Sequence, residues 1–358
     1  MTEFRVLWRI GFRMGVVLVF SGVVDGLTEY LPAEQHAATE SPTSESQTTS
    51  QPPATNDMVR RKVMIPSTAD GTDQPCYVTL PAGFDSRQPA VPLLVSLHSW
   101  SGNVEQRSAS QQMLEKMAIE RGWIYLFPNF RAANRRPDAC GSAKAQQDIL
   151  DAVAWAKAQY PVDPRRIYLT GSSGGGHMTM LMVGCHPHIW AAASAWVGIS
   201  DLAAWHQFHA GDRYGAMMRA SCGGAPGESP QIDRQYRERS PLSHLARAID
   251  VPLDIAAGIH DGHRGSVPIR HSLDAFNEIA KAVGGKPISD AEIRQLSQPN
   301  GRLDQPQPSD RESDPVLGRK IYLRRRAGKA RITIFEGGHE GLAGPAIAWL
   351  ERHVRPQQ

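Results

Sequence analysis

Apolar and polar positions alternate along the chain in two patterns: short continuous apolar runs, and longer segments whose apolar residues recur at helical spacing. Continuous runs are typical of β-strands buried on both faces of a sheet, and 91–98 (VPLLVSLH) is the clearest of them. Strands are predicted at 76–81, 91–98, 123–129, 165–171, 190–200, 252–260 and 330–337, and helices at 108–121, 143–160, 273–283 and 345–354. This alternation predicts an α/β fold with a mostly parallel central sheet and helices on both faces.

Two segments interrupt the alternation. Residues 200–243 contain several Trp, Tyr and Gly, and we expect them to form a lid or one wall of a pocket. Residues 284–318 are polar and rich in Pro, Asp and Gln, which favours a surface insertion.

The N-terminal region differs in composition from the rest of the chain. Basic residues (Arg5, Arg9 and Arg13) precede an apolar stretch at 14–24, which is long enough for the core of a signal peptide but short for a membrane span. Residues 1–32 are therefore predicted to be a signal peptide or, if uncleaved, an N-terminal anchor, and the protein to be secreted or periplasmic. Contact with a membrane is expected only through an uncleaved anchor.

The segment that follows, residues 33–57, is rich in Ser, Thr, Pro, Gln and Glu and almost free of large apolar residues. Such a segment cannot bury enough apolar surface to offset the entropy of ordering, and it is predicted to be a disordered linker. Residues 58–358 form the predicted catalytic domain.

Charge and cysteine content exclude several classes of protein. A net charge of +3 over 358 residues gives no indication of nucleic-acid binding. The basic clusters at 135–136 and 324–326 are predicted to be solvated surface. The four cysteines match no zinc-site spacing; Cys185 and Cys222 are the favoured pair, and four buried free thiols are an equal alternative.

The segment GSSGG (171–175) follows a predicted strand and opens a helix. It fits G-x-S-x-G with Ser173 at the centre, the motif in which a sharp strand-to-helix turn lifts a nucleophilic serine clear of the sheet. Ser172 does not fit, because Thr170 would take one glycine position. No phosphate-binding G-x-x-x-x-G-K-[ST] is present.

A serine nucleophile needs a base and a group that orients the base. Of thirteen histidines, His339 in FEGGHEG directly follows the last strand and is the predicted base. Asp261, after the 252–260 strand, is the predicted acid, and Asp201, after the preceding strand, is its rival. Asp254 points along a strand and is expected to serve structure.

The remaining candidates have other expected roles. His353 is placed on the surface of the closing helix, and His98 and His177 beside the pocket in supporting positions. His260, Asp261 and His263 resemble metal ligands in spacing, but no further conspicuous ligand accompanies them, so neither a metal nor an organic cofactor is expected.

Negative charge on the substrate oxygen must be stabilised during acyl transfer. The backbone N–H of Gly174, directly after the nucleophile, is one expected donor. The second should come from LHSWSG (97–102), after an early buried strand. Either Ser99 or Trp100 can supply it, and Trp100 is favoured.

Together, LHSWSG, YLTGSSGGGHM, GIHDG…VP and EGGHE resemble the α/β-hydrolase fold, and within it the catalytic domain of the prolyl oligopeptidase family of serine peptidases. The resemblance covers 62–354 and implies Ser173 as nucleophile, Asp261 as acid and His339 as base. The chain departs from the family in two respects. No β-propeller is expected ahead of the domain, and Asp261 stands six residues before Val267 rather than two or three.

The sequence thus predicts a serine hydrolase that forms an acyl-enzyme on a small peptide or ester substrate. A prolyl-oligopeptidase-like peptidase is the first reading, and a secreted carboxylic ester hydrolase acting on carbohydrate or short-acyl esters is the alternative. A catalytically inactive binding module on the same fold is the reading from a different class. Substrate, leaving group and oligomeric state remain open.

Overall fold

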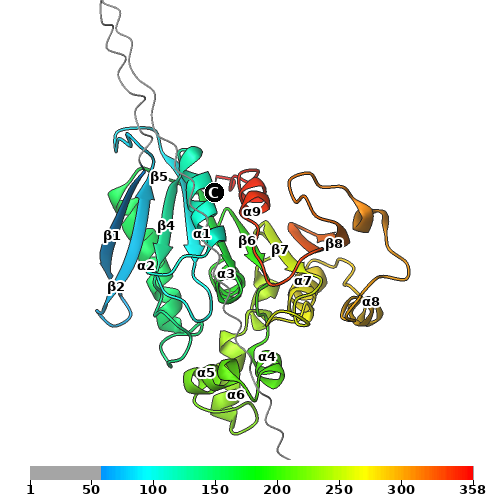
Figure 1. The fold of residues 1–358 in the computed structure, drawn as a ribbon. Coiled ribbons are helices and arrows are strands. Elements are labelled where there is room, and N and C mark those ends of the chain that lie inside the picture. Colours follow the sequence, from blue (N-terminus) through cyan, green and yellow to red (C-terminus); the bar gives the residue numbers. More distant parts are fainter. Residues whose placement is uncertain (1–57, 358) are drawn as a thin grey trace, which may run out of the picture. The chain divides into compact units, whose positions relative to one another are not determined.

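A computed structural model describes residues 58–357 (Figure 1). The predicted signal peptide or anchor and the predicted linker lie outside the described residues. No helix between residues 58 and 357 is long and apolar enough to cross a membrane.

Nine strands form one sheet in the order β1-β2-β4-β3-β5-β6-β7-β9-β8. Their bounds are β1 Val59–Pro66, β2 Asp73–Leu80, β3 Val91–Leu97, β4 Ile124–Pro128, β5 Val162–Ser172, β6 Ala192–Trp196, β7 Leu253–Gly258, β8 Ile321–Ala327 and β9 Ala330–Phe335. Six strands that are adjacent in this order (β4, β3, β5, β6, β7 and β9) are parallel to one another. Strands β1, β2 and β8 run antiparallel to their neighbours. The prediction of a mostly parallel sheet is confirmed.

Helices cover both faces of the sheet because the direction in which successive strands are added across the sheet changes after β4. The crossover from β3 to β4 steps one way and carries α1 (Ala109–Glu120). The crossover from β4 to β5 steps back and carries α2 (Ala143–Gln159). Since parallel crossovers are right-handed, opposite steps place these helices on opposite faces. Later crossovers continue the second step, so α3 (Gly174–Cys185) and α7 (Arg270–Ala282) share the α2 face, while α9 (Ala343–Leu350) packs against α1.

Three elements differ from the sequence prediction. The antiparallel edge strands β1 and β8 were not predicted, because each carries three basic residues within a short strand. Strand β6 is shorter than the predicted 190–200, because Val197 has a φ of 43° that extended backbone cannot contain.

The prediction of a solvated basic cluster at 324–326 is wrong for two of its three residues. Arg324 is 5% exposed and pairs with Asp314 at 2.9 Å and Glu312 at 3.4 Å. Arg325 pairs with Glu292 and Asp310. These carboxylates come from the segment predicted to be a surface insertion, which instead carries α8 (Asp290–Leu296) and buries Ile288, Ile293 and Leu296. That segment covers β8, and its carboxylates neutralise the charges of Arg324 and Arg325.

The segment predicted as a lid or pocket wall forms three short helices, α4 (Leu202–Phe208), α5 (Arg213–Cys222) and α6 (Pro230–Arg239), set apart from the sheet (Figure 1). They enclose a hydrophobic cluster of their own, which also takes in Trp100, Cys140 and Val267. The large aromatic residues Trp205 and Tyr236 are at most 1% exposed, so they pack rather than line a pocket.

The favoured cysteine pairing is not found. All four cysteines are free, and Cys185 is half-buried next to Arg247 rather than Cys222. Cys222 instead shares the hydrophobic cluster of helices α4, α5 and α6 with Cys140. Burial raises the pKa of the Cys140 thiol.

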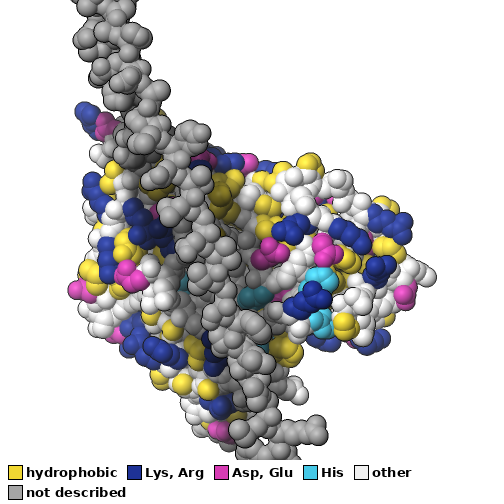
Figure 2. All heavy atoms as spheres, viewed as in Figure 1, with side chains coloured by type: hydrophobic (Ala, Val, Ile, Leu, Met, Phe, Trp, Pro, Cys, Tyr) yellow, Lys and Arg dark blue, Asp and Glu magenta, His cyan; other side chains and the backbone are white. Residues whose placement is uncertain are grey.

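Basic and acidic side chains are interspersed over the visible part of the face drawn in Figure 2. This agrees with the small net charge of the chain.

Candidate active site

Ser173 stands in a strained turn between β5 and α3. Its backbone has φ 59° and ψ −118°, outside the regions that a non-glycine residue normally adopts, and its side chain makes no capping bond to the helix that it opens. The surrounding glycines permit the turn: a Cβ at Gly171 would lie 2.5 Å from the carbonyl of Gly175. The predicted elbow geometry is therefore present at Ser173, with the hydroxyl left free.

The loop after β3 approaches this turn closely. A Cβ at Gly174 would collide with the backbone nitrogen of Trp100, so the amides of residues 174 and 100 are neighbours. The Trp100 N–H makes no hydrogen bond within the described part of the chain. Two adjacent backbone donors at a helix N-terminus are the arrangement that stabilises an oxyanion.

A second loop holds the Trp100 backbone in place. Asn134 donates its N–H to the carbonyl oxygen of Trp100 at 3.0 Å. Asn134 lies in the loop between β4 and α2, which begins with three successive left-handed residues, Phe130, Arg131 and Ala132. Each such residue costs roughly 1–2 kcal/mol of backbone strain, so this loop needs support from side chains.

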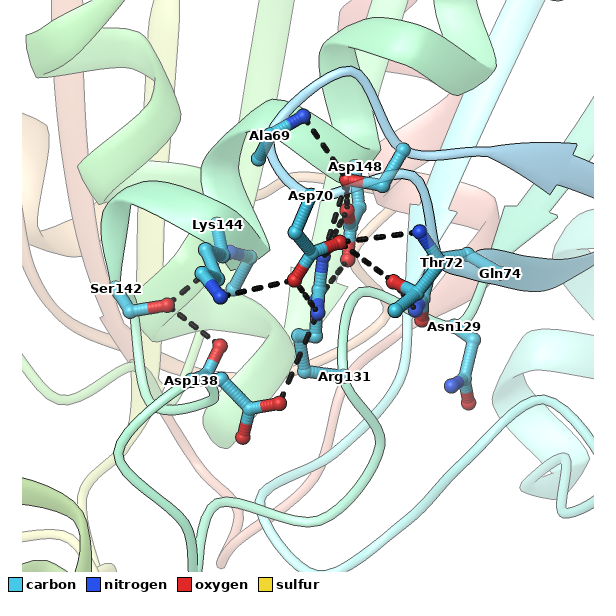
Figure 3. Close-up of polar contacts among 12 residues, drawn as sticks. Ala69, Asp70, Thr72, Gln74, Asn129, Arg131, Asp138, Ser142, Lys144 and Asp148 are labelled. Carbon is cyan, nitrogen blue, oxygen red and sulfur yellow. Dashed lines mark hydrogen bonds and ion pairs between the residues drawn. The ribbon is translucent and has the colours of Figure 1, made fainter.

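Arg131 supplies that support through an ion network that runs from the buried Asp148 to Asp70 at the surface (Figure 3). Its guanidinium group contacts Asp148 at 2.7 Å and Asp70 at 2.8 Å, while Ser67 and Lys144 complete the cluster. Hydrogen bonding by Arg131 lowers the pKa of Asp70 below its ordinary value. The network joins the turn after β1, the loop after β4 and helix α2, and so fixes the support of the Trp100 loop.

Asp261 and His339 are brought together from the loops after β7 and β9. Asp261 Oδ2 lies 2.8 Å from Nδ1 of His339, and its side chain is fully buried while the imidazole is 25% exposed. The other carboxylate oxygen accepts the N–H groups of Gly262 and Val267 at 3.0 and 3.1 Å. The extra residues between Asp261 and Val267 therefore curl around the carboxylate without displacing it.

Ser266 belongs to this loop and was not predicted as a site residue. Its hydroxyl lies 3.4 Å from Nε2 of His339, the nitrogen that a nucleophile would use. Its carbonyl oxygen accepts hydrogen bonds from the side chains of Trp205 in α4 and His209 directly after α4. Nothing in the sequence pattern distinguishes this serine, because its place depends on the curl of the loop.

The structure places Ser173 and His339 on adjoining loops without a hydrogen bond between the two side chains. The two loops approach closely: a Cβ at Gly341 would collide with the hydroxyl of Ser172. The Gly341 carbonyl also accepts a hydrogen bond from the Ser110 hydroxyl at 2.8 Å. Catalytic hydrogen bonds often form fully only once substrate binds, so a pair that is unbonded before binding is compatible with proton transfer.

The rival acids have structural contacts of their own. Asp201 caps helix α4 by accepting the N–H groups of Ala203 and Ala204. Asp254 pairs with Arg331 at 2.7 Å inside the sheet. Neither carboxylate contacts His339.

His98 and His177 hold backbone rather than reacting groups. His98 lies with its ring nitrogens against the carbonyl oxygens of Ser99 and Asn129. His177 reaches the carbonyl of Arg239 and packs against Trp100. His353 lies beyond the end of α9 and is half-buried, so its predicted place on the helix surface is wrong.

Because His177 and His271 are buried, we predict that the free energy of unfolding decreases in acid. Burial lowers the pKa of each to about 4, from an ordinary value of 6.5. Below pH 6.5 the unfolded chain takes up protons that the folded chain refuses, so the free energy of unfolding falls until about pH 4. The loss should reach about 3 kcal/mol for each histidine.

Urea unfolding between pH 7 and 4.5 measures this loss, and His177→Gln should reduce the slope. The exposed His188, changed to Gln, is the control and should leave the slope unchanged. Equal slopes in wild type and His177→Gln would contradict the assignment.

A cavity of about 490 Å³ opens beside the oxyanion loop, at Ser101. Polar side chains dominate its lining, among them Asn103, Gln106, Arg135 and Arg136. Met217 of helix α5 also lines it. It offers hydrogen-bond donors and acceptors one residue away from Trp100.

Comparison with known proteins connects this geometry to a family. Residues 111–291 match the prolyl oligopeptidase family. The chain is 24% identical over 196 residues to feruloyl esterase B of Talaromyces stipitatus, covering 53% of this chain and 47% of that protein. It is 29% identical over 243 residues to the acylamino-acid-releasing enzyme of Arabidopsis thaliana, covering 62% of this chain and 29% of that protein.

Among solved structures, the acylaminoacyl peptidase of Pyrococcus horikoshii superposes with a TM-score of 0.51 at 18% identity, covering 64% of this chain and 36% of that one. At this identity the likeness establishes the fold alone, which is the α/β-hydrolase fold. The matched part spans less than half the length of each of these three proteins. The family match covers half of the present chain and includes the Ser173 turn and Asp261, so the chain belongs to the prolyl oligopeptidase family.

Proposed function

We propose that the protein is a serine hydrolase that cleaves a peptide or ester bond through an acyl-enzyme. The observation that carries the proposal is the Asp261–His339 pair, a buried carboxylate bonded to Nδ1 of a partly exposed imidazole on the loop next to the strained Ser173 turn. A fixed carboxylate on Nδ1 leaves Nε2 unprotonated and able to accept the serine proton.

In the proposed mechanism, Ser173 attacks the substrate carbonyl while His339 removes its proton. The N–H groups of Gly174 and Trp100 stabilise the oxyanion, and His339 then protonates the leaving group. Water, activated by the same imidazole, releases the acid. For this cycle His339 must exchange its contact with Ser266 for one with Ser173.

Two substrate classes follow from two observations. Peptide amides are the first candidate, because the chain belongs to a peptidase family and resembles an acylamino-acid-releasing enzyme. Carbohydrate or short-acyl esters are the second. The cavity beside Trp100 presents amide, hydroxyl and guanidinium groups that suit a hydroxylated leaving group, and one relative is a feruloyl esterase. We further propose that the protein acts after export, on the basis of its N-terminal sequence.

Parallel assays of p-nitrophenyl acetate, methyl ferulate and a panel of peptide p-nitroanilides test both candidates. We expect p-nitrophenyl acetate to be hydrolysed, since esters have good leaving groups and need little help from the general acid. Hydrolysis of the anilides as well would establish a peptidase, and hydrolysis of esters alone would exclude one. Failure to hydrolyse any of them, together with no labelling by a fluorophosphonate, would support the inactive binding module.

A further inference from the structure

A second, larger cavity lies at the opposite edge of the sheet from the candidate active site. Its volume is about 830 Å³, within the range of small-molecule sites. It is lined by the residues that directly precede three parallel strands, Ala191 before β6, Pro252 before β7 and Lys329 before β9, and by the segment after α9. Asp261 and His339 follow the other ends of β7 and β9, so a six-residue strand, roughly 20 Å, separates the two sites.

The lining of this cavity is strongly cationic. It contains Arg247, Arg326, Lys329, Arg352 and Arg355, against a single acidic residue, Asp250. Asp250 lies 3.6 Å from Lys329, and none of the four arginines pairs with a carboxylate of residues 58–357. Burial and the neighbouring Arg331 and Arg324 lower the pKa of Arg326, and Glu312 and Asp254 offset this only in part.

Two buried polar groups at the cavity also lack partners. Trp349 is 6% exposed, and its indole Nε1, which can only donate, has no acceptor in the described part of the chain. His353 Nε2 is likewise buried without a partner, and the two rings lie 4.7 Å apart. Buried polar groups are nearly always satisfied, so two unpaired nitrogens on residues that line one cavity mark this region as unusual within residues 58–357.

Most of the remaining lining is apolar and includes Pro187, Ala191, Pro252, Val354 and Pro356, with His188 as a further polar residue. A bare inorganic anion would leave this surface uncovered, and an uncharged apolar molecule would leave the arginines unbalanced. A ligand that carries both an anionic group and an apolar body satisfies both halves of the cavity.

We propose that this cavity is a binding site for a small amphiphilic anion, a carboxylate, sulfonate or phosphate joined to an apolar body. The anionic group lies among the arginines, and the body packs on the prolines and Val354. The site is separate from the hydrolytic centre and does not depend on the proposed function.

Titration of the full chain with 8-anilinonaphthalene-1-sulfonate, whose fluorescence rises in an apolar site, tests the proposal. We expect one site per chain, weakened by salt. Displacement by hexanoate and hexyl phosphate in separate arms ranks carboxylate against phosphate. Hexanol and inorganic phosphate, each with half of the ligand chemistry, should displace the probe poorly.

Arg352→Glu reverses an exposed charge at the cavity and should raise the Kd of the probe at least tenfold. Arg294→Glu, an exposed arginine of α8 that pairs with no carboxylate of the described chain and lies outside the cavity, is the matched control and should bind like wild type. Ester hydrolysis by both variants reports that the fold is intact. No binding by wild type, equal binding by Arg352→Glu, or equal displacement by hexanol would overturn the proposal.

Discussion

Ser173→Ala is expected to lower kcat for p-nitrophenyl acetate by about 10⁴- to 10⁶-fold, the cost of removing the nucleophile from an acyl-enzyme mechanism. The substitution removes only an oxygen that makes no capping bond, so the strained turn and the fold should persist. Steady-state hydrolysis and fluorophosphonate labelling measure the effect, and labelling should disappear.

Ser172→Ala is the matched control, since the two serines are adjacent in one turn. Ser172 contacts the Gly341 loop, and its loss should leave activity of the same order as wild type. A Ser173→Ala variant that is still labelled would exclude Ser173 as nucleophile.

Asp261→Asn is expected to lower kcat by about 10⁴-fold while preserving the loop. The asparagine oxygen can still accept the N–H groups of Gly262 and Val267, but its NH₂ would donate to Nδ1 of His339. The imidazole would then carry its proton on Nε2 and could not accept one from serine. Hydrolysis of p-nitrophenyl acetate and thermal unfolding together separate this loss of activity from a loss of stability.

Asp201→Asn provides the comparison for the acid. Asparagine caps helices as well as aspartate does, so helix α4 should be retained and activity should stay near that of wild type. If Asp201→Asn were the inactive variant and Asp261→Asn the active one, the acid would be reassigned.

The sequence was sufficient for the central sheet because strands buried on both faces are continuous apolar runs, as in β3 and β7. The two strands missed from the prediction, β1 and β8, lie at the edges. In β8 the apolar pattern is broken by Arg324 and Arg325, whose burial depends on carboxylates that arrive from a segment 10 to 33 residues earlier. No local pattern reveals such distant compensation.

The candidate site could be predicted as far as its residues follow the ends of strands. Ser173 stands directly after β5, Asp261 three residues after β7 and His339 four residues after β9, and the topology brings those strand ends to one edge of the sheet. Ser266 and Asn134 could not be predicted, because they reach His339 and Trp100 through loop conformations. The Cys185–Cys222 pairing failed for the same reason: Cys140 comes near Cys222 through a left-handed turn.

The left-handed run at Phe130–Ala132 also has a consequence for engineering. Phe130 stacks on His98 and Arg131 anchors the ion network, so both side chains offset the strain they impose. Ala132 has a φ of 57° and no comparable contact to offset it. Glycine, which weakens most positions, should therefore be neutral or favourable here, and a library screened for heat resistance should be enriched in glycine at residue 132.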